Sequence, residues 1–269
     1  MNCKICNSNS NHFLDSTIFK EKQPIAYYKC TSCGFIQTEE PYWLEKAYSS
    51  VIAKTDIGLI SRNIVFSDLT ESILNHFFAD TKKALDYGAG FGMFVRIMRD
   101  KGYNFLWYDD YCQNIFAETF EGSLSEKYDV LTAYEVFEHL PDPIDVLEKL
   151  LNLSDTIIFS TVLNDGIDDF NAWWYRAEAS GQHISFHSTR SLQYLAKKYN
   201  LNYYHANGKT LHVFTKKTLN ELHFNLLFNT NDTRANRLKR MLMIKPFKKK
   251  ESLLQSDFDR LIKKQLLNT

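Results

Sequence analysis

The chain has 269 residues, of which 44% are hydrophobic, 14% aromatic and 24% charged. Such a composition can bury a sizeable core, which excludes disordered and collagen-like proteins, and the length suits one large α/β domain with small additions. The 32 basic and 32 acidic side chains cancel, so the net charge gives no argument for a nucleic acid or a membrane as partner.

Four of the five cysteines lie in the first forty residues, as two Cys-x-x-Cys pairs. Cysteines in this spacing favour a metal site in a reducing compartment over a disulfide framework, and Cys112 is left over. Two thiolates in one tight turn reach the same Zn²⁺, and a second pair completes a closed, structural site. His12 could replace one ligand, although nothing requires it. The expected zinc ligands are Cys3, Cys6, Cys30 and Cys33.

Helical and strand-like patterns alternate over the middle of the chain. Strands that alternate with helices predict a parallel sheet, and the two last strands, separated only by Gly208 and Lys209, predict an antiparallel hairpin. Ser67 is the expected N-cap of the first helix. The predicted elements are helix 67–78, strand 84–88, helix 91–101, strand 103–109, helix 112–118, strand 128–134, helix 143–152, strand 156–163, helix 189–199, strand 201–207 and strand 210–216.

Three glycines follow the first strand, in the sequence ALDYGAGFG. Glycines between a strand and a helix allow a tight turn and the close approach of a ligand, although an ordinary turn would contain them too. A dinucleotide fingerprint would place its third glycine at position 93, which is Met93. Asp86, two residues before the first glycine, also argues against a dehydrogenase.

The segment Asp86–Gly92 resembles motif I of class I S-adenosylmethionine-dependent methyltransferases, and the resemblance covers roughly residues 60–217. It implies a Rossmann-like α/β sheet, mostly parallel with an antiparallel C-terminal hairpin, and S-adenosylmethionine as cofactor. In that family the acid holds the methionine end of the cofactor, and the glycine backbone packs against it. The expected cofactor contacts in this segment are Asp86, Tyr87, Gly88 and Gly90.

Asp109 ends the second strand, where α/β cofactor domains place an acid that accepts hydrogen bonds from ribose hydroxyls. Asp110, the next residue, is the alternative candidate for this role, and a solvated turn aspartate is the structural alternative. After the third strand, YEVFEHLPDP resembles the segment that follows motif IV in small-molecule methyltransferases. The resemblance places Glu135 near the cofactor and His139 on the substrate side. Glu138 is expected to be a surface charge.

A long insertion, residues 164–188, separates the fourth strand from the next helix, and loops of this size are usually functional. Part of it resembles a Gln-His-Ile-Ser-Phe pattern of methyltransferases encoded with bacterial glycan-building enzymes. We expect a lid that carries the catalytic base, with His183 as the leading candidate and His139 as the second. Core packing is the alternative for the paired tryptophans. The expected substrate contacts in the insertion are Trp173, Tyr175 and His187.

Residues 43–64 resemble the segment that leads into the domain in the same proteins and covers the cofactor cleft. There Arg62 is expected to pair with a carboxylate or phosphate of the substrate, and a surface arginine is the alternative.

The charges are unevenly distributed along the chain. Residues 231–269 hold 11 basic and 4 acidic side chains, net +7, which leaves 21 basic and 28 acidic ones, net −7, in residues 1–230. The basic tail predicts contact with an anionic membrane surface or a lipid-linked pyrophosphate substrate, or else a solvated extension or oligomer contact. No apolar run approaches the roughly 20 residues that span a bilayer, and the first residues lack a signal-peptide segment. We expect a cytoplasmic protein, peripheral at the inner membrane face if the tail binds lipid.

The sequence thus predicts a zinc ribbon at 1–40, a methyltransferase domain at 41–217 and a basic helical extension at 218–269. The expected acceptor is a sugar hydroxyl, in a nucleotide sugar or a surface glycan. One alternative is C-methylation of a keto-deoxysugar nucleotide. Another is a zinc-ribbon adaptor that binds nucleic acid and has a vestigial cofactor fold, but the acidic body speaks against nucleic acid as a partner.

Overall fold

The computed structural model describes residues 1–49, 56–206, 210–229 and 231–267, which form two compact units. Unit 1 comprises Met1–Ala53 and Ala133–Thr218, and unit 2 comprises Lys54–Thr132 and Leu219–Thr269. Gly208, Lys209 and part of the segment 43–64 lie outside the described residues. In the part that is described, no helix is long and apolar enough to cross a membrane. The domain boundaries expected from the sequence stay a prediction.

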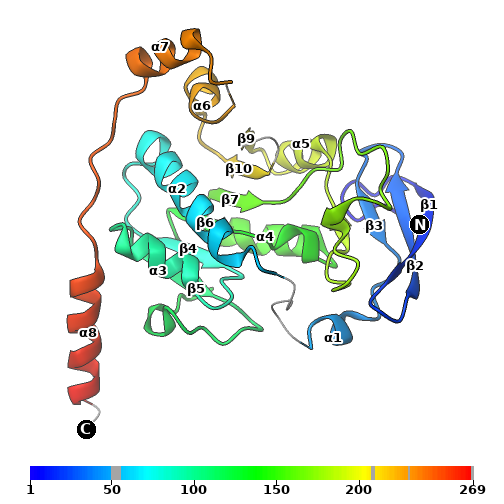
Figure 1. Ribbon diagram of the computed structural model, residues 1–269, viewed down its shortest axis with the longest axis horizontal. Helices are drawn as coiled ribbons and strands as arrows, with labels where there is room; N and C mark the ends of the chain where they lie inside the picture. Colours follow the sequence, from blue (N-terminus) through cyan, green and yellow to red (C-terminus); the bar gives the residue numbers. More distant parts are fainter. Residues whose placement is uncertain (50–55, 207–209, 230, 268–269) are drawn as a thin grey trace. The chain divides into compact units, whose positions relative to one another are not determined.

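Unit 2 contains a parallel sheet in which β4 (Ala84–Tyr87) lies between β5 (Phe105–Tyr108) and β6 (Val130–Ala133). The strands are short and mostly buried, as expected for parallel strands covered by helices. Helices α2 (Leu59–Phe77) and α3 (Met93–Asp100) pack against each other beside these strands (Figure 1). The three predicted strands and the helix after the glycine turn are therefore confirmed.

Two predicted helices of unit 2 are wrong in extent or in kind. Helix α2 begins eight residues before the predicted start, and Ser67 is not its N-cap, because its hydroxyl donates to the carbonyl of Ile64 within the helix at 2.7 Å. The predicted helix 112–118 does not form, and a 3₁₀ turn, η1 (Glu118–Phe120), stands at its end. The amides of Ile115 and Phe116 donate to the carbonyl of Phe91 instead of to a helical partner.

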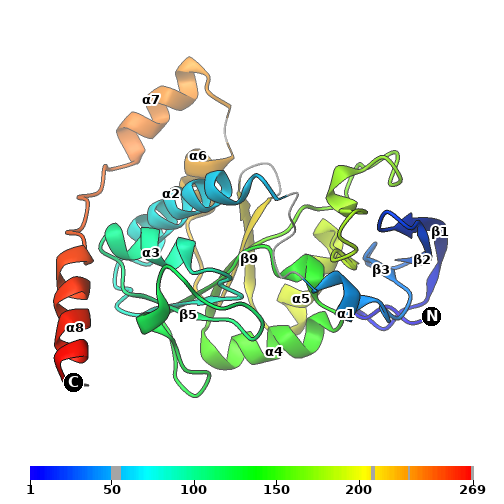
Figure 2. The same ribbon diagram turned by 60° about the horizontal axis from the view of Figure 1, so that its bottom comes forward.

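Three helices complete unit 2: α6 (Glu221–Phe228), α7 (Arg234–Met243) and α8 (Leu254–Leu267). Helix α7 has no buried residue. Helix α8, red in Figure 2, begins at a buried ion pair with α3, in which Arg99 binds both carboxylate oxygens of Asp257 at 2.6 and 2.8 Å. The Arg99 guanidinium also stacks on the ring of Phe120 at 3.7 Å. The basic tail is thus anchored at α8, whereas α7 is exposed.

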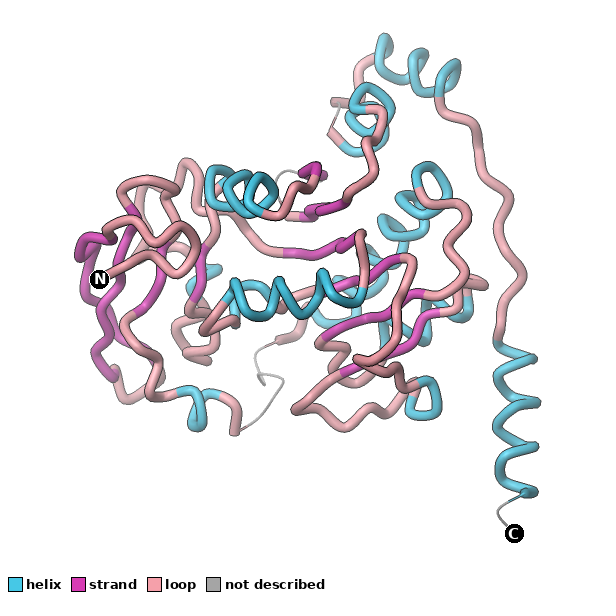
Figure 3. Tube along the Cα trace, turned by 180° about the vertical axis from the view of Figure 1, so that it is seen from behind, coloured by secondary structure: helices cyan, strands magenta, loops and turns pink. Residues whose placement is uncertain are grey.

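Unit 1 contains an antiparallel N-terminal sheet with the order β1 (Ser10–Ile18), β2 (Gln23–Cys30), β3 (Ile36–Thr38) and β8 (Ser185–Phe186). Figure 3 shows its strands in magenta beside the N-terminus. The short helix α1 (Leu44–Ala47) follows β3. Strand β8 comes from the long insertion and was not expected from the sequence, because two residues are too few to show a period of two.

The remaining strands of unit 1 are also antiparallel, with β10 (Leu211–Thr215) between β7 (Thr156–Ser160) and β9 (Asn202–Ala206). This confirms the predicted hairpin. Helix α4 (Pro143–Leu153) begins at Asp142, whose carboxylate accepts from the amide of Asp145 at 3.2 Å. Helix α5 (Thr189–Lys198) begins at a capping box. Parallel and antiparallel strands with these helices give the mixed α/β, Rossmann-like fold class expected from the sequence.

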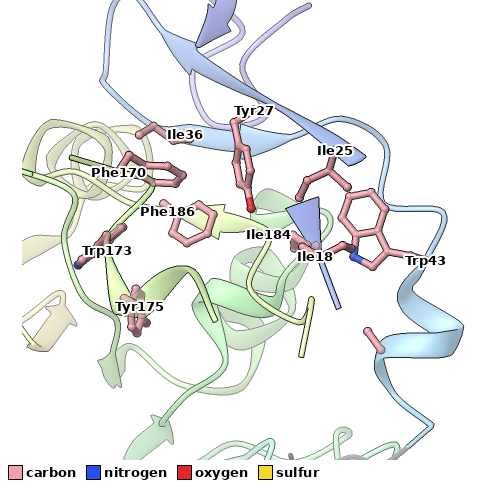
Figure 4. Close-up of a cluster of buried hydrophobic side chains, with 11 residues drawn as sticks. Ile18, Ile25, Tyr27, Ile36, Trp43, Phe170, Trp173, Tyr175, Ile184 and Phe186 are labelled. Atoms are coloured by element: carbon pink, nitrogen blue, oxygen red, sulfur yellow. The ribbon is translucent and has the colours of Figure 1, made fainter. Parts of the chain in front are cut away.

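Four aromatic residues of the insertion belong to the hydrophobic core of unit 1, namely Phe170, Trp173, Tyr175 and Phe186 (Figure 4). Trp173 is 8% exposed and Tyr175 is 2% exposed, and both contact Phe186 of β8, whereas Trp174 is 75% exposed. Trp43 donates from its indole nitrogen to the carbonyl of Gly181 at 2.9 Å. The insertion is therefore packed into the N-terminal sheet, which differs from the expected lid.

Candidate functional site

The glycine turn of unit 2 lies at the carboxyl end of β4. Gly88, Gly90 and Gly92 all have positive φ angles, between 54° and 80°, which favour glycine. A Cβ atom built on Gly90 would meet no other atom within 4 Å, whereas one on Gly92 would collide with the side chain of Asn114. The turn therefore leaves space for a ligand at Gly90, at the edge where parallel α/β sheets bind their ligands.

Asp86 lies on β4, two residues before the turn, and it is only 4% exposed. Its carboxylate accepts a hydrogen bond from the hydroxyl of Thr132 on β6 at 2.6 Å. Burial, aided by the nearby charge of Asp109, raises the pKa of Asp86 to about 7. A cationic group of a ligand would stabilise the ionised form of Asp86. The site therefore favours a positively charged ligand. Tyr87, next to it, stacks on Tyr108.

Asp109 follows β5 and organises the loop around the glycine turn. One carboxylate oxygen accepts from the amide of Gly90 at 2.8 Å, and the other accepts from the amides of Tyr111 and Cys112, both at 2.8 Å. These three bonds leave room for about one more donor on the carboxylate. The side chain of Asp110 instead accepts from the hydroxyl of Tyr108. The geometry thus ties Asp109, and not Asp110, to the glycine turn.

Glu135 belongs to unit 1, just after β6, and has a strained backbone. Its φ angle of +56° lies in the left-handed region, which is unfavourable for a residue with a side chain. Ser160 stabilises it twice, because its hydroxyl accepts from the Glu135 amide at 2.7 Å and donates to the carboxylate at 2.8 Å. Strain of this kind in non-glycine residues is concentrated at functional sites.

Glu138, His139 and His183 form a second polar group in unit 1, with one possible ligand atom from each lying within 4.8 Å of the others. Glu138 and His139 lie in η2 (Phe137–His139), and His183 precedes β8. Glu138 has no exposed surface, so the expectation of a surface charge is wrong. The reason is that the insertion covers η2, where the amide of Ile184 donates to the carbonyl of Glu138 at 2.9 Å.

Both histidines of this cluster donate from Nδ1 to backbone carbonyls. The acceptor is Gln182 for His139, at 3.1 Å, and Tyr175 for His183, at 2.5 Å. Because a carbonyl can only accept, this geometry places a proton on Nδ1 of each ring. Burial also lowers the pKa of His139 to about 4, which keeps the ring neutral at pH 7.

The four N-terminal cysteines converge on one point. The Sγ atoms of Cys3 and Cys33 lie 3.6 Å apart, those of Cys6 and Cys30 lie 3.4 Å apart, and all four lie within 4.8 Å of one another. In a tetrahedral zinc site the sulfurs are about 3.8 Å apart, so the arrangement fits zinc. The hydrogen bond with Cys33 lowers the pKa of Cys3 to about 5, which favours a thiolate.

A family model described as a methyltransferase domain matches residues 62–206, more than half of the 269 residues. The chain belongs to this methyltransferase family. The matched segment is therefore a methyltransferase domain. The glycine turn suits the cofactor, because Gly90 offers the space and Asp86 offers a carboxylate for the cationic methionine end. The bound cofactor would supply an electrophilic methyl group.

Several proteins are similar to the methyltransferase. The ubiquinone biosynthesis O-methyltransferase of Actinobacillus pleuropneumoniae serotype 7 (strain AP76) is 29% identical over a match that covers 31% of this chain and 46% of that protein. The chain therefore spans less than half the length of this relative. The plantazolicin methyltransferase BpumL, solved with SAH and a pentazolic desmethylPZN analogue, is 15% identical with a TM-score of 0.45, covering 64% of this chain and 91% of that one. An O-methyltransferase family protein from Burkholderia thailandensis is 12% identical with a TM-score of 0.43, covering 66% and 64%.

The methyltransferase structure places the other expected substrate residues in packed or paired positions. Arg62 binds Asp56 through two hydrogen bonds, at 2.8 and 2.6 Å. His187 has no exposed surface, and burial lowers its pKa to about 3. Trp173 and Tyr175 lie in the core of unit 1. The substrate contacts expected of these four residues stay predictions.

Sequence reasoning missed two polar residues that support the sites of the methyltransferase. Ser160 holds Glu135, and nothing in its strand marks it as different from a core position. The sequence could have marked Glu138 as a site residue, because it directly precedes His139 in a short segment between a strand and two prolines. The sequence does not show that this acidic side chain is buried.

Proposed function

We propose that this methyltransferase transfers the methyl group of S-adenosylmethionine to a hydroxyl of a sugar, in a nucleotide sugar or a surface glycan. The proposal is supported by the insertion and its resemblance to methyltransferases encoded with glycan-building enzymes. A similar curated protein is named as an O-methyltransferase, which agrees with oxygen as the acceptor atom.

The observation that carries the proposal is the cluster of Glu138, His139 and His183. Methyl transfer from a sulfonium requires alignment of the acceptor oxygen, the methyl carbon and the sulfur, together with removal of the hydroxyl proton. Two imidazoles that lie beside a buried carboxylate are suited to act on such a proton. His139 and His183 are both partly exposed residues, which leaves the cluster accessible to an acceptor.

A methyl-transfer screen over nucleotide sugars and short glycans tests this function. We expect a methyl ether on one hydroxyl, and the acceptor that lacks this hydroxyl should give no product. A methyl group on carbon would favour the keto-deoxysugar alternative. Transfer to non-sugar acceptors alone would contradict the proposal while leaving the S-adenosylmethionine-dependent activity intact.

We further propose that one structural zinc ion is bound by Cys3, Cys6, Cys30 and Cys33. The site is closed, with four protein sulfurs and a mostly buried position. Hydrogen bonds fix its surroundings, since Ser188 donates to the carbonyl of Cys33 at 2.5 Å and Asn164 donates to the carbonyl of Gly34 at 3.1 Å. The zinc would thus hold the N-terminal sheet together with the insertion that carries His183.

We propose that α7 contacts an anionic membrane surface or the pyrophosphate of a lipid-linked acceptor. Exposed apolar residues alternate there with basic ones, as in helices that lie in a membrane interface. Leu238, Met241 and Leu242 are each more than half exposed. Co-sedimentation with anionic and neutral vesicles tests the proposal, and equal retention by the two would contradict it.

A further inference from the structure

Trp174 is the exposed tryptophan of the chain, and it lies in the middle of the insertion. It is 75% exposed, whereas Trp43, Trp107 and Trp173 are between 3% and 9% exposed. Its other neighbour, Tyr175, belongs to the core of unit 1 together with Trp173 (Figure 4). An indole in water forgoes the free energy of burial, and tryptophan is enriched on surfaces that bind a partner. Trp174, and not Trp173, is therefore the tryptophan of the pair that can contact a ligand.

The backbone around Trp174 is held in place. The residue begins the 3₁₀ turn η3 (Trp174–Arg176), whose last residue, Arg176, is buried. The guanidinium of Arg176 donates to the carboxylate of Glu178 at 2.6 Å. The indole ring meets the ring of Tyr175 edge to face, with centroids 5.4 Å apart. An aromatic ring on a fixed backbone loses little conformational entropy when a ligand stacks on it.

Trp174 adjoins the cluster of Glu138, His139 and His183 through a single aromatic ring. The ring of Tyr175 contacts both Trp174 and His183, and the centroids of Tyr175 and His183 lie 4.7 Å apart. The carbonyl of Tyr175 also accepts the hydrogen bond from Nδ1 of His183. Trp174 is thus two ring contacts away from His183, a separation that a ligand of more than one ring can bridge.

The charges of the insertion favour an uncharged ligand. Residues 164–188 contain four carboxylate side chains and a single arginine or lysine, Arg176. Asp168, Asp169 and Glu178 are exposed, whereas Arg176 is buried and paired with Glu178. A pyrophosphate at this surface would meet negative charges, which is unfavourable. The face of an indole ring is itself partly negative, and it attracts the weakly positive C–H groups of a sugar ring.

We propose that Trp174 binds an uncharged sugar ring of the acceptor by stacking, next to the sugar whose hydroxyl receives the methyl group. The acceptor is then a glycan of at least two sugar units, and not a nucleotide sugar. This inference rests on the proposed function and narrows it, because it selects one of the two acceptor classes.

Steady-state kinetics of the full chain test this role, with neutral oligosaccharides and nucleotide sugars as probes at saturating S-adenosylmethionine. We expect Trp174→Ala to raise KM for an oligosaccharide acceptor about 5- to 10-fold with kcat nearly unchanged, because Trp174 contacts the acceptor away from the reacting hydroxyl. Trp174→Phe keeps a flat ring and should restore most of the affinity. Tyr42→Ala removes another exposed aromatic ring of unit 1 and should leave both constants unchanged.

Acrylamide quenching of tryptophan fluorescence gives a second measurement that does not need turnover. Since the other three tryptophans are buried, acrylamide should quench mainly Trp174 in the native protein and much less in Trp174→Phe. An oligosaccharide bound together with S-adenosylhomocysteine should protect Trp174 from the quencher, and a nucleotide sugar should not. Thermal melting of each variant shows whether it is folded.

The inference is overturned if native protein and Trp174→Ala methylate an oligosaccharide with the same KM, or if a nucleotide sugar is methylated and protects Trp174. In both cases the proposed sugar methylation stands. Protection of Trp174 by an oligosaccharide that is never methylated would support the stacking role and refute the proposed function. Protection by neither class of sugar would refute the stacking role.

Discussion

The glycine turn of unit 2 and the histidine cluster of unit 1 are built from the chain in different ways. Asp86 lies on the strand that Gly88 and Gly90 follow, and Asp109 holds this turn through the Gly90 amide. The cluster instead joins Glu138 and His139 to His183 across β7 and much of the insertion. The comparison shows that a local site is visible as a motif, whereas a site built from distant segments depends on what covers them.

The largest effect is expected from Cys30→Ser, which removes one zinc ligand from the N-terminal sheet. Structural zinc contributes about 10–16 kcal/mol in small zinc domains, so much of unit 1 should lose its order. Elemental analysis and hydrogen exchange of the N-terminal strands measure this effect. Cys112→Ser, at a cysteine outside the cluster, is the matched control and should keep the zinc. Normal exchange protection in Cys30→Ser would show that zinc does not support the sheet.

His183→Ala separates the cluster from the glycine turn. We expect turnover to fall about 10²–10⁴-fold, because the base that removes the proton of the acceptor hydroxyl is lost. The affinity for S-adenosylmethionine should stay nearly unchanged. Single-turnover rates and calorimetry measure the two quantities. Loss of activity in His139→Ala but not in His183→Ala would identify His139, in η2, as the catalytic base. Full activity of both variants would contradict a hydroxyl acceptor.

Asp86→Asn changes stability and binding in opposite directions. Because the pKa of Asp86 rises from 3.8 to about 7 on folding, the cofactor-free folded state keeps a proton that the unfolded state has lost within this window. Stability of the native protein should therefore fall as pH rises from about 4 to 7, by at most about 4 kcal/mol. Asp86→Asn should lack this loss and unfold at a higher denaturant concentration at pH 8.

The same Asp86→Asn variant should bind S-adenosylmethionine more weakly, because it lacks the carboxylate for the cationic end. Denaturant unfolding at pH 5 and pH 8, with and without cofactor, measures both effects. Asp80→Asn removes an exposed carboxylate and serves as control. An identical pH dependence in Asp86→Asn and the native protein would show that Asp86 is not the buried acid responsible.

The smallest effect is expected from Asp109→Ala, which should weaken S-adenosylmethionine binding by about 1.5–3 kcal/mol through the loss of charged hydrogen bonds. Part of this loss comes from the Gly90 amide, which Asp109 holds. Calorimetric titration of Asp109→Ala and Asp110→Ala decides between the two neighbours, since the Asp110 carboxylate accepts from the hydroxyl of Tyr108 instead. A larger effect in Asp110→Ala would reverse the assignment.

Sequence patterns were enough to predict the family, the three parallel strands of unit 2, the antiparallel hairpin and the cysteine pairs. These features depend on residues close together in the chain, such as the acid and glycines at 86–92, and on the regular alternation of strands and helices. Such patterns record local backbone hydrogen bonding and turn geometry, which the neighbouring residues largely decide.

The burial of polar residues and the packing of the insertion became visible only in the folded chain. Glu138 has the sequence environment of a surface helix charge, but the insertion covers it. Trp173 belongs to the core because β8 pairs with β3, and the Nδ1 protons of His139 and His183 follow from two distant carbonyls. Burial and the position of a ring proton depend on the segment that packs above a residue, and no local pattern contains that information.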